Sequence, residues 1–218
     1  LMLHGLIACG GAYALAFRLL GQPSAALATA MFYGLSGYFA AHAQHVGMFE
    51  TAAWLPWLVL LLEVLGERLT APRLALAALL GAALALPGHF QVALYAFSGA
   101  AVWAVGEALV RRAAWVAFRR TVGLLVAGVW GGLLSAVMIL PAIELVGQSL
   151  RTRLDAATID IGYFHPEALL TLVQPDHYSL LGGHYTGPGD STQHYFYAGI
   201  LLVPLVLLGL RTRPALRT

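Results

Sequence analysis

The sequence predicts an all-α membrane protein, a polytopic transmembrane helical bundle with one long outer loop that carries a short interfacial helix. Three observations predict this fold. Hydrophobic residues make up 60% of the 218 residues, and the mean hydropathy is +0.77. Charged residues make up only 10%, whereas a soluble domain carries roughly 25%. The basic residues, all of them arginine, also recur at the ends of apolar segments or between them.

About seven apolar segments approach the roughly 20 residues that are needed to cross a bilayer. They are 2–20, 24–41, 51–66, 73–87, 90–106, 121–141 and 195–210. Small residues within them, such as Gly34, Gly81 and Gly131, favour close packing between helices. We expect residues 1–218 to form one transmembrane domain and to be a fragment of a longer protein.

The arginines predict which ends of the segments share a side. Strict alternation of seven spans places ten of the twelve arginines on one side, which the positive-inside rule assigns to the cytoplasm. These ten are Arg18, Arg68, Arg73, Arg111, Arg112, Arg119, Arg120, Arg211, Arg213 and Arg217. All eight histidines map to the opposite, outer side. The chain is therefore expected to be a multi-pass protein of the cytoplasmic (inner) membrane.

The long polar stretch 142–194 is predicted to be an extracytoplasmic loop, because connections of this length are usually functional or disordered. Within it, Pro166 and Glu167 are typical of a helix start and Pro175 is expected to end that helix. The two apolar turns between them predict a short helix that lies on the membrane and carries Asp176 and His177 at its end.

Four outer residues are candidates for lining a cleft, namely His45, His89, Asp176 and His177. Imidazole and carboxylate groups in a cleft can act as general bases or orient a polar acceptor. Hydrogen-bonded interfacial histidine is the plainer interpretation. His42 and His45, with Glu50 nearby, also leave a divalent metal open, although no ligand motif of known strength is present. We therefore assign no metal and no cofactor.

Arg151 and Arg153 are the two arginines on the outer side. A guanidinium group can bind phosphate oxygens in a bidentate manner, so these residues are candidates for binding a lipid phosphate. The alternative is that they pair with Asp155 and Asp160 or contact headgroups non-specifically.

The sequence excludes cysteine-based links and argues against nucleic acid as a partner. The single cysteine, Cys9, excludes an internal disulfide and a cysteine-based metal cluster, and its apolar neighbours predict a packing role. The arginines are scattered at helix ends instead of forming a basic face with interleaved aromatic residues, so nucleic acid is not an expected partner.

Several short motifs resemble those of the bacterial YfhO-like membrane proteins. They are Tyr33-Gly34-Leu35-Ser36-Gly37-Tyr38, His45, Trp54-Leu55-Pro56, Gly88-His89-Phe90-Gln91, Tyr95, Gln174-Pro175-Asp176-His177-Tyr178 and Tyr197-Ala198-Gly199-Ile200. The resemblance implies a GT-C-type fold, which glycosyltransferases that use polyprenyl-phosphate-linked sugars share. In that fold an acidic catalytic residue usually lies in the first outer loop, and here it would lie upstream of Leu1. No catalytic residue is therefore assigned, and enzymatic activity is left open.

The resemblance implies transfer of a sugar from a polyprenyl-phosphate donor to a cell-envelope glycan or glycolipid acceptor on the outer face. Membrane lipid is a further expected partner. Two other classes stay open, a lipid or polysaccharide transporter (flippase) and a non-catalytic assembly protein. A transporter favours polar residues at mid-membrane and broken helices, whereas the polar residues here gather at one face.

Overall fold

The computed structural model describes residues 1–149, 164–179, 183–189, 191–192 and 194–212. These residues are helical wherever they are regular, and no strand occurs among them. The elements are α1 (Met2–Leu20), α2 (Pro23–Gly34), α3 (Gly37–Ala41), α4 (Val46–Ala53), α5 (Leu55–Glu67), α6 (Ala71–Ala85), α7 (Phe90–Arg111), α8 (Ala114–Leu134), α9 (Ala136–Gln148), the 3-10 helix η3 (Pro166–Leu172) and α10 (Leu202–Thr212). The predicted all-α class is confirmed.

Three helices in the described part of the chain are long and apolar enough to cross a membrane. They are Met2–Leu20, with 19 residues, Val46–Glu67, with 22, and Ala114–Leu134, with 21. The second combines α4 and α5, which join at Trp54 in helical geometry. Ala71–Ala85, Phe90–Gly106 and Ala136–Gln148 are shorter apolar helices. These lengths indicate a multi-pass membrane protein.

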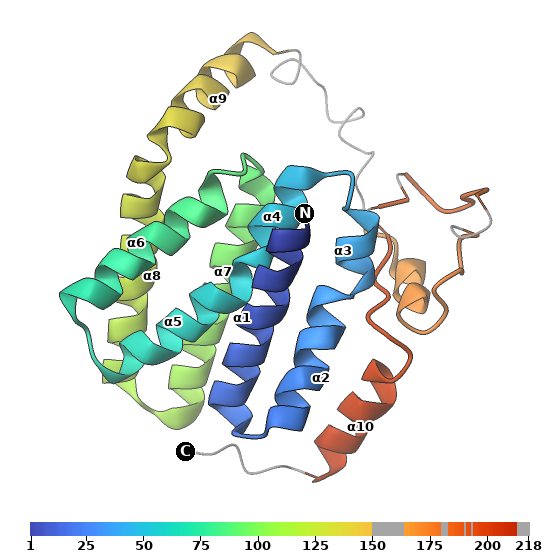
Figure 1. The fold of residues 1–218 in the computed structure, drawn as a ribbon, viewed down its shortest axis with the longest axis horizontal. Coiled ribbons are helices and arrows are strands. Elements are labelled where there is room, and N and C mark those ends of the chain that lie inside the picture. Colours follow the sequence, from blue (N-terminus) through green and yellow to red (C-terminus); the bar gives the residue numbers. More distant parts are fainter. Residues whose placement is uncertain (150–163, 180–182, 190, 193, 213–218) are drawn as a thin grey trace.

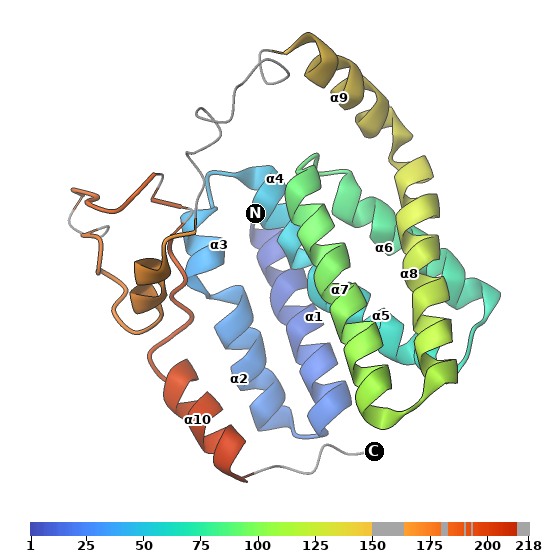
Figure 2. The same ribbon diagram turned by 180° about the vertical axis from the view of Figure 1, so that it is seen from behind.

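The helices are arranged around α1 (Figures 1 and 2). α1 and α2 lie side by side, and α10 is seen next to α2 at the edge of the bundle in both views. α5 and α6 cross obliquely in front of α7 and α8 in Figure 1. α9 leaves the bundle at the end of α8, and none of its residues is buried.

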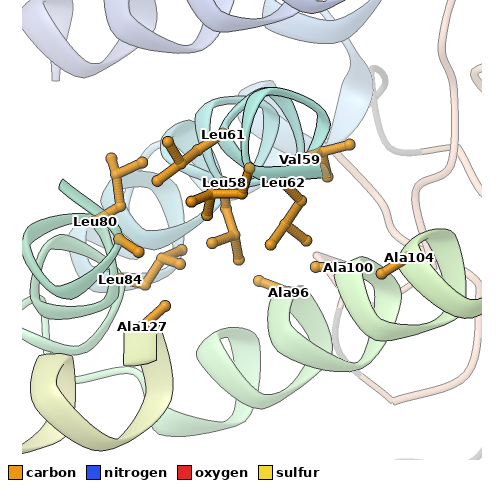
Figure 3. Close-up of a cluster of buried hydrophobic side chains, with 12 residues drawn as sticks. Leu58, Val59, Leu61, Leu62, Leu80, Leu84, Ala96, Ala100, Ala104 and Ala127 are labelled. Carbon is orange, nitrogen blue, oxygen red and sulfur yellow. The ribbon is translucent and has the colours of Figure 1, made fainter. Parts of the chain in front are cut away.

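The main hydrophobic core lies where α5, α6, α7 and α8 meet (Figure 3). α5 contributes leucines, including Leu58 and Leu62, whereas α7 contributes the alanines Ala96, Ala100 and Ala104 at a spacing of four. Residues four apart share one face of a helix, so small side chains line one face of α7 and leave room for the leucines. A second, smaller core joins α1, α3 and α4 around Ala8, Phe39 and Ala53.

Glycines set the closest approaches between helices. A Cβ atom on Gly131 of α8 would lie 2.5 Å from the carbonyl carbon of Gly81 in α6. In the same way, Cys9 of α1 packs over Gly34 of α2. Both contacts fit the packing roles predicted for these small residues.

The second predicted span, 24–41, is interrupted between α2 and α3. Ser36 has an extended backbone, with φ −66° and ψ 157°. The next amide, that of Gly37, donates a hydrogen bond to the carbonyl oxygen of Tyr197 at 2.5 Å. Glycine and serine are poor residues for a helix interior. Here the carbonyl group of Tyr197, far away in sequence, accepts the hydrogen bond that the Gly37 amide would donate within a continuous helix.

The seventh predicted span, 195–210, is helical only from Leu202. Before it, the amide of Phe196 donates to Thr171 Oγ1 at 3.0 Å. Gly199 adopts φ +106°, a left-handed conformation that glycine favours. These side-chain and backbone contacts hold 195–201 outside helical geometry.

The sixth predicted span, 121–141, is divided between α8 and α9 at Ser135, whose hydroxyl group donates to the carbonyl oxygen of Ala82 at 3.4 Å. α9 continues through Pro141 to Gln148. It therefore covers the first residues of the loop predicted at 142–194.

The short helix predicted in the outer segment is present, as a 3-10 helix. η3 begins at Pro166 and ends at Leu172, with Glu167 in its first turn. Thr171 is fully buried, and its Oγ1 donates to the carbonyl oxygen of Ala168 at 2.6 Å and lies 3.3 Å from that of His194, a second possible acceptor. η3 therefore packs against the chain that leads to α10, and its predicted position at the membrane surface stays a prediction.

Candidate functional site

The two ends of the helical body carry different polar groups. At one end, the C-terminus of α5 is surrounded by arginines: Arg18 pairs with Glu67, and Arg119 donates to the carbonyl oxygens of Gly66 and Glu67. Arg73 donates to the carbonyl oxygen of Val64 at 2.7 Å. Cations at a helix C-terminus interact favourably with its unpaired carbonyls. The predicted topology requires these arginines to share one end, and the side of a membrane that they face stays a prediction.

The opposite end begins with a contact between α1 and α4. His4 Nδ1 lies 3.4 Å from Glu50 Oε1, and both side chains are about a quarter exposed. The His4 ring also meets the Trp54 ring edge to face, with centroids 6.3 Å apart. This pair ties the first residues of α1 to the helix that follows the α3–α4 link.

His42 and His45 lie in that link. His42 is 5% exposed, stacks on the ring of Tyr38 at 4.4 Å, and has Nδ1 2.9 Å from the carbonyl oxygen of Tyr38. Because a carbonyl only accepts, Nδ1 of His42 carries the proton. The His45 ring lies 5.7 Å from that of His42. His45 Nδ1 is shielded from solvent, and it has no hydrogen-bond partner among the described residues.

His89 occupies the turn between α6 and α7 and caps α7. Its Nδ1 accepts a hydrogen bond from the amide of Val92 at 3.3 Å, so this nitrogen is unprotonated. Gly47 of α4 packs against the same turn, since a Cβ there would lie 2.7 Å from the carbonyl oxygen of Pro87 and 3.6 Å from His89 Cβ. The elements that carry His45 and His89 are therefore neighbours.

The described residues between 164 and 197 lie beside α3 (Figure 1), where Tyr195 and Tyr197 pack against Gly37. His194 is 4% exposed, and its ring lies 5.4 Å from that of His165. His177 lies against Tyr178, with ring centroids 4.7 Å apart. Asp176 is exposed, and its charge acts on Tyr195.

A pocket of about 410 Å³ opens between this segment and the end of α3. Its lining residues are Ala40, Ala41, Ala43, Gln44, Ser191, Thr192 and Tyr195. Burial, the neighbouring Tyr197 and the charge of Asp176 together raise the pKa of the half-buried Tyr195 phenol. A tyrosine phenol is protonated at neutral pH even without this shift, so Tyr195 can donate a hydrogen bond.

Neither the protein-family models, nor the curated proteins, nor the solved structures include a match to this chain. The site is therefore assigned from its geometry alone.

The structure distributes the predicted site residues over two neighbouring groups. His45 and His89 lie on adjoining elements at one end of the bundle, and Asp176 and His177 lie just after η3, in the part of the chain beside α3. Arg151 and Arg153, with Asp155 and Asp160, lie outside the described residues. Within the described part of the chain, no group of three or more His, Cys, Asp or Glu residues is placed to hold a metal ion.

Sequence reasoning missed a buried ion pair at the arginine end. Arg120 Nη2 lies 2.8 Å from Glu63 Oε1, and Trp103 Nε1 donates to the same oxygen at 2.7 Å. Arg120 was expected in a connecting loop, yet it is 4% exposed. Gly66 leaves room for it, because a Cβ there would lie 2.9 Å from Arg120 Nε. Glu63, an acidic residue inside the predicted span 51–66, was the available signal, since a carboxylate at membrane depth needs a partner.

Proposed function

We propose that the chain belongs to a GT-C-like integral membrane glycosyltransferase with about seven membrane crossings. The parent protein transfers a sugar from a polyprenyl-phosphate donor to a cell-envelope acceptor on the outer face of a bacterial cytoplasmic membrane. One observation carries the proposal: histidines, one of them paired with a glutamate, and a pocket lie at one end of an apolar helical body, and arginines pack at the other.

The chemistry of glycosyl transfer asks two things of this end. The acceptor hydroxyl must lose a proton as its oxygen attacks the anomeric carbon, and the phosphate that leaves must be held. Imidazole can take such a proton, and His45 offers a shielded Nδ1 beside His42. In the proposal Arg151 and Arg153 bind the donor phosphate, for which a planar guanidinium group is suited.

A transporter is the second candidate, and the Glu63–Arg120 pair is the observation that favours it. Ionisable residues inside membrane helices often mark transport pathways. Here, however, the two charges neutralise each other and Trp103 donates to the same carboxylate oxygen. The pair also lies at the arginine end, away from the pocket, which favours a structural role.

The test uses the full-length protein in proteoliposomes with a radiolabelled polyprenyl-phosphate-linked sugar. Transferase activity releases polyprenyl phosphate and moves the label to an acceptor, whereas a transporter moves the intact donor across the bilayer. If the labelled sugar stays on its donor and the donor stays in its original leaflet, both candidates are rejected in favour of an assembly role.

Substitution of Arg151 and Arg153 gives a more specific test of donor binding. A hydrogen bond to a charged group contributes about 1.5–3 kcal/mol, so the variant Arg151→Lys with Arg153→Lys should raise the donor KM roughly 10- to 100-fold. Arg211→Lys, at the opposite end by the predicted topology, is the matched control. An exposed pair with Asp155 and Asp160 would account for less than about 1 kcal/mol, and an unchanged donor KM would reject the phosphate role.

A further inference from the structure

The pocket beside α3 has a lining suited to one kind of ligand. We propose that this pocket binds the neutral ring of a sugar, an inference that rests on the proposed function and names the part of the substrate held here. The donor and the acceptor both contain such a ring, so the shared chemistry is a neutral saccharide.

The lining supplies both surfaces that a sugar ring needs. Ala40, Ala41 and Ala43 supply apolar lining that the C–H groups of a ring can contact. Gln44, Ser191, Thr192 and Tyr195 bring amide and hydroxyl groups. Those groups both donate and accept hydrogen bonds, as do the hydroxyls of a sugar. The volume of about 410 Å³ falls within the range of roughly 300–1,000 Å³ found for small-molecule sites.

The local charge argues against an anionic ligand in the same place. None of the described lining residues carries a formal charge at neutral pH. The negative charge of Asp176 acts on Tyr195, where it helps to raise the pKa of the phenol. The same field disfavours a phosphate or carboxylate group beside Tyr195. The phosphate of a lipid-linked donor would therefore lie outside this pocket.

Gly37 positions the aromatic side chain. A Cβ on Gly37 would lie 2.6 Å from Tyr195 Cδ1 and Cε1, and 2.7 Å from the carbonyl oxygen of Tyr197. No Cβ can approach so closely, so any larger residue at position 37 displaces the ring of Tyr195 or the backbone beside it. Gly37 is thus a positioning residue for the pocket without lining it.

The experiment is a saturation-transfer NMR titration of the full-length protein in nanodiscs with glucose, N-acetylglucosamine and glucuronate. We expect the two neutral sugars to bind and glucuronate to bind more weakly. Tyr195→Phe should weaken neutral-sugar binding about 2- to 10-fold, which corresponds to the loss of one neutral hydrogen bond. Tyr95→Phe, at an exposed position on α7, should leave it unchanged.

Gly37→Ala tests the pocket without replacing any residue that lines it. It should weaken neutral-sugar binding at least as much as Tyr195→Phe does. Gly99→Ala is its control, because a Cβ there meets no atom within 4 Å. Absence of neutral-sugar binding, glucuronate binding as tight as glucose binding, or affinity unchanged by both variants would overturn the inference.

A transfer assay separates this inference from the proposed function. Neutral-sugar binding without transfer would reject the function and keep the pocket. Transfer with donor and acceptor KM values unchanged by Tyr195→Phe would keep the function and reject the pocket. A raised acceptor KM assigns the pocket to the acceptor, and a raised donor KM assigns it to the donor sugar.

Discussion

Glu63 and Arg120 form an ion pair inside the helical body, with 2.8 Å between Oε1 and Nη2. The pair joins α5 to α8, and Trp103 adds α7 through its hydrogen bond to the same carboxylate oxygen. Three helices that surround the main core therefore meet at one oxygen atom.

Removing one charge of this pair should destabilise the protein strongly. Glu63→Leu leaves the Arg120 guanidinium buried without its carboxylate, and such a loss costs about 3–5 kcal/mol. Unfolding in mixed micelles, followed by circular dichroism, measures it. Glu144→Leu is the matched control on exposed α9, and Glu63→Leu with Arg120→Leu should recover much of the loss. If Glu63→Leu destabilised the protein no more than Glu144→Leu does, the pair would not be stabilising.

The contact between α6 and α8 should be sensitive to a single methyl group. Gly131→Ala places a Cβ 2.5 Å from the carbonyl carbon of Gly81, so the two helices must separate, at a cost of about 1–3 kcal/mol. Gly132→Ala, one residue along the same helix, meets no atom within 4 Å and should be neutral or slightly stabilising. Thermal stability of the two variants in nanodiscs checks the contrast, and equal melting temperatures would contradict the close approach.

The predicted sidedness can be tested by cysteine labelling in a Cys9→Ala background. A cysteine at Thr70, beside the arginine end, should react with an impermeant maleimide only after the cell is opened. A cysteine at Ser191, beside the pocket, should react in intact spheroplasts. Equal labelling from outside at both positions would reject the predicted topology.

His45 should matter for turnover more than the other histidines that are predicted to face the outer side. If its imidazole accepts the acceptor proton, His45→Gln should lower kcat by about 10²- to 10⁴-fold, the usual contribution of a general base. His184→Gln, at an exposed position, should leave kcat unchanged. Donor binding by both variants serves as the folding control, and a kcat unaffected by His45→Gln would assign the proton transfer to another group.

Local sequence signals predicted much of the helical framework. Gly21 ends α1 in a left-handed conformation, with φ 66° and ψ 16°, at the boundary expected after Leu20. Pro166 starts η3 as predicted. Such signals act within one turn of the chain, so the sequence displays them directly.

The breaks in the predicted spans depend on partners far away in sequence. The α2–α3 break is held by Tyr197, and the late start of α10 follows from the bond between Phe196 and Thr171. Hydropathy records neither contact, because it measures composition along one segment. The candidate site also depends on distant partners. Alternation of spans predicted a shared end for the histidines, whereas the pocket forms only when Ser191, Thr192 and Tyr195 fold against the end of α3.

The bond between Gly37 and Tyr197 also bears on biosynthesis. The amide of Gly37 finds its partner only after the ribosome has made Tyr197, long after α2 and α3 have left the exit tunnel. A buried amide without a partner is costly, so the Gly37 amide depends on water as its partner until Tyr197 is in place. Truncation of the chain before Tyr197 would leave the Gly37 amide without the acceptor that it has in the folded chain.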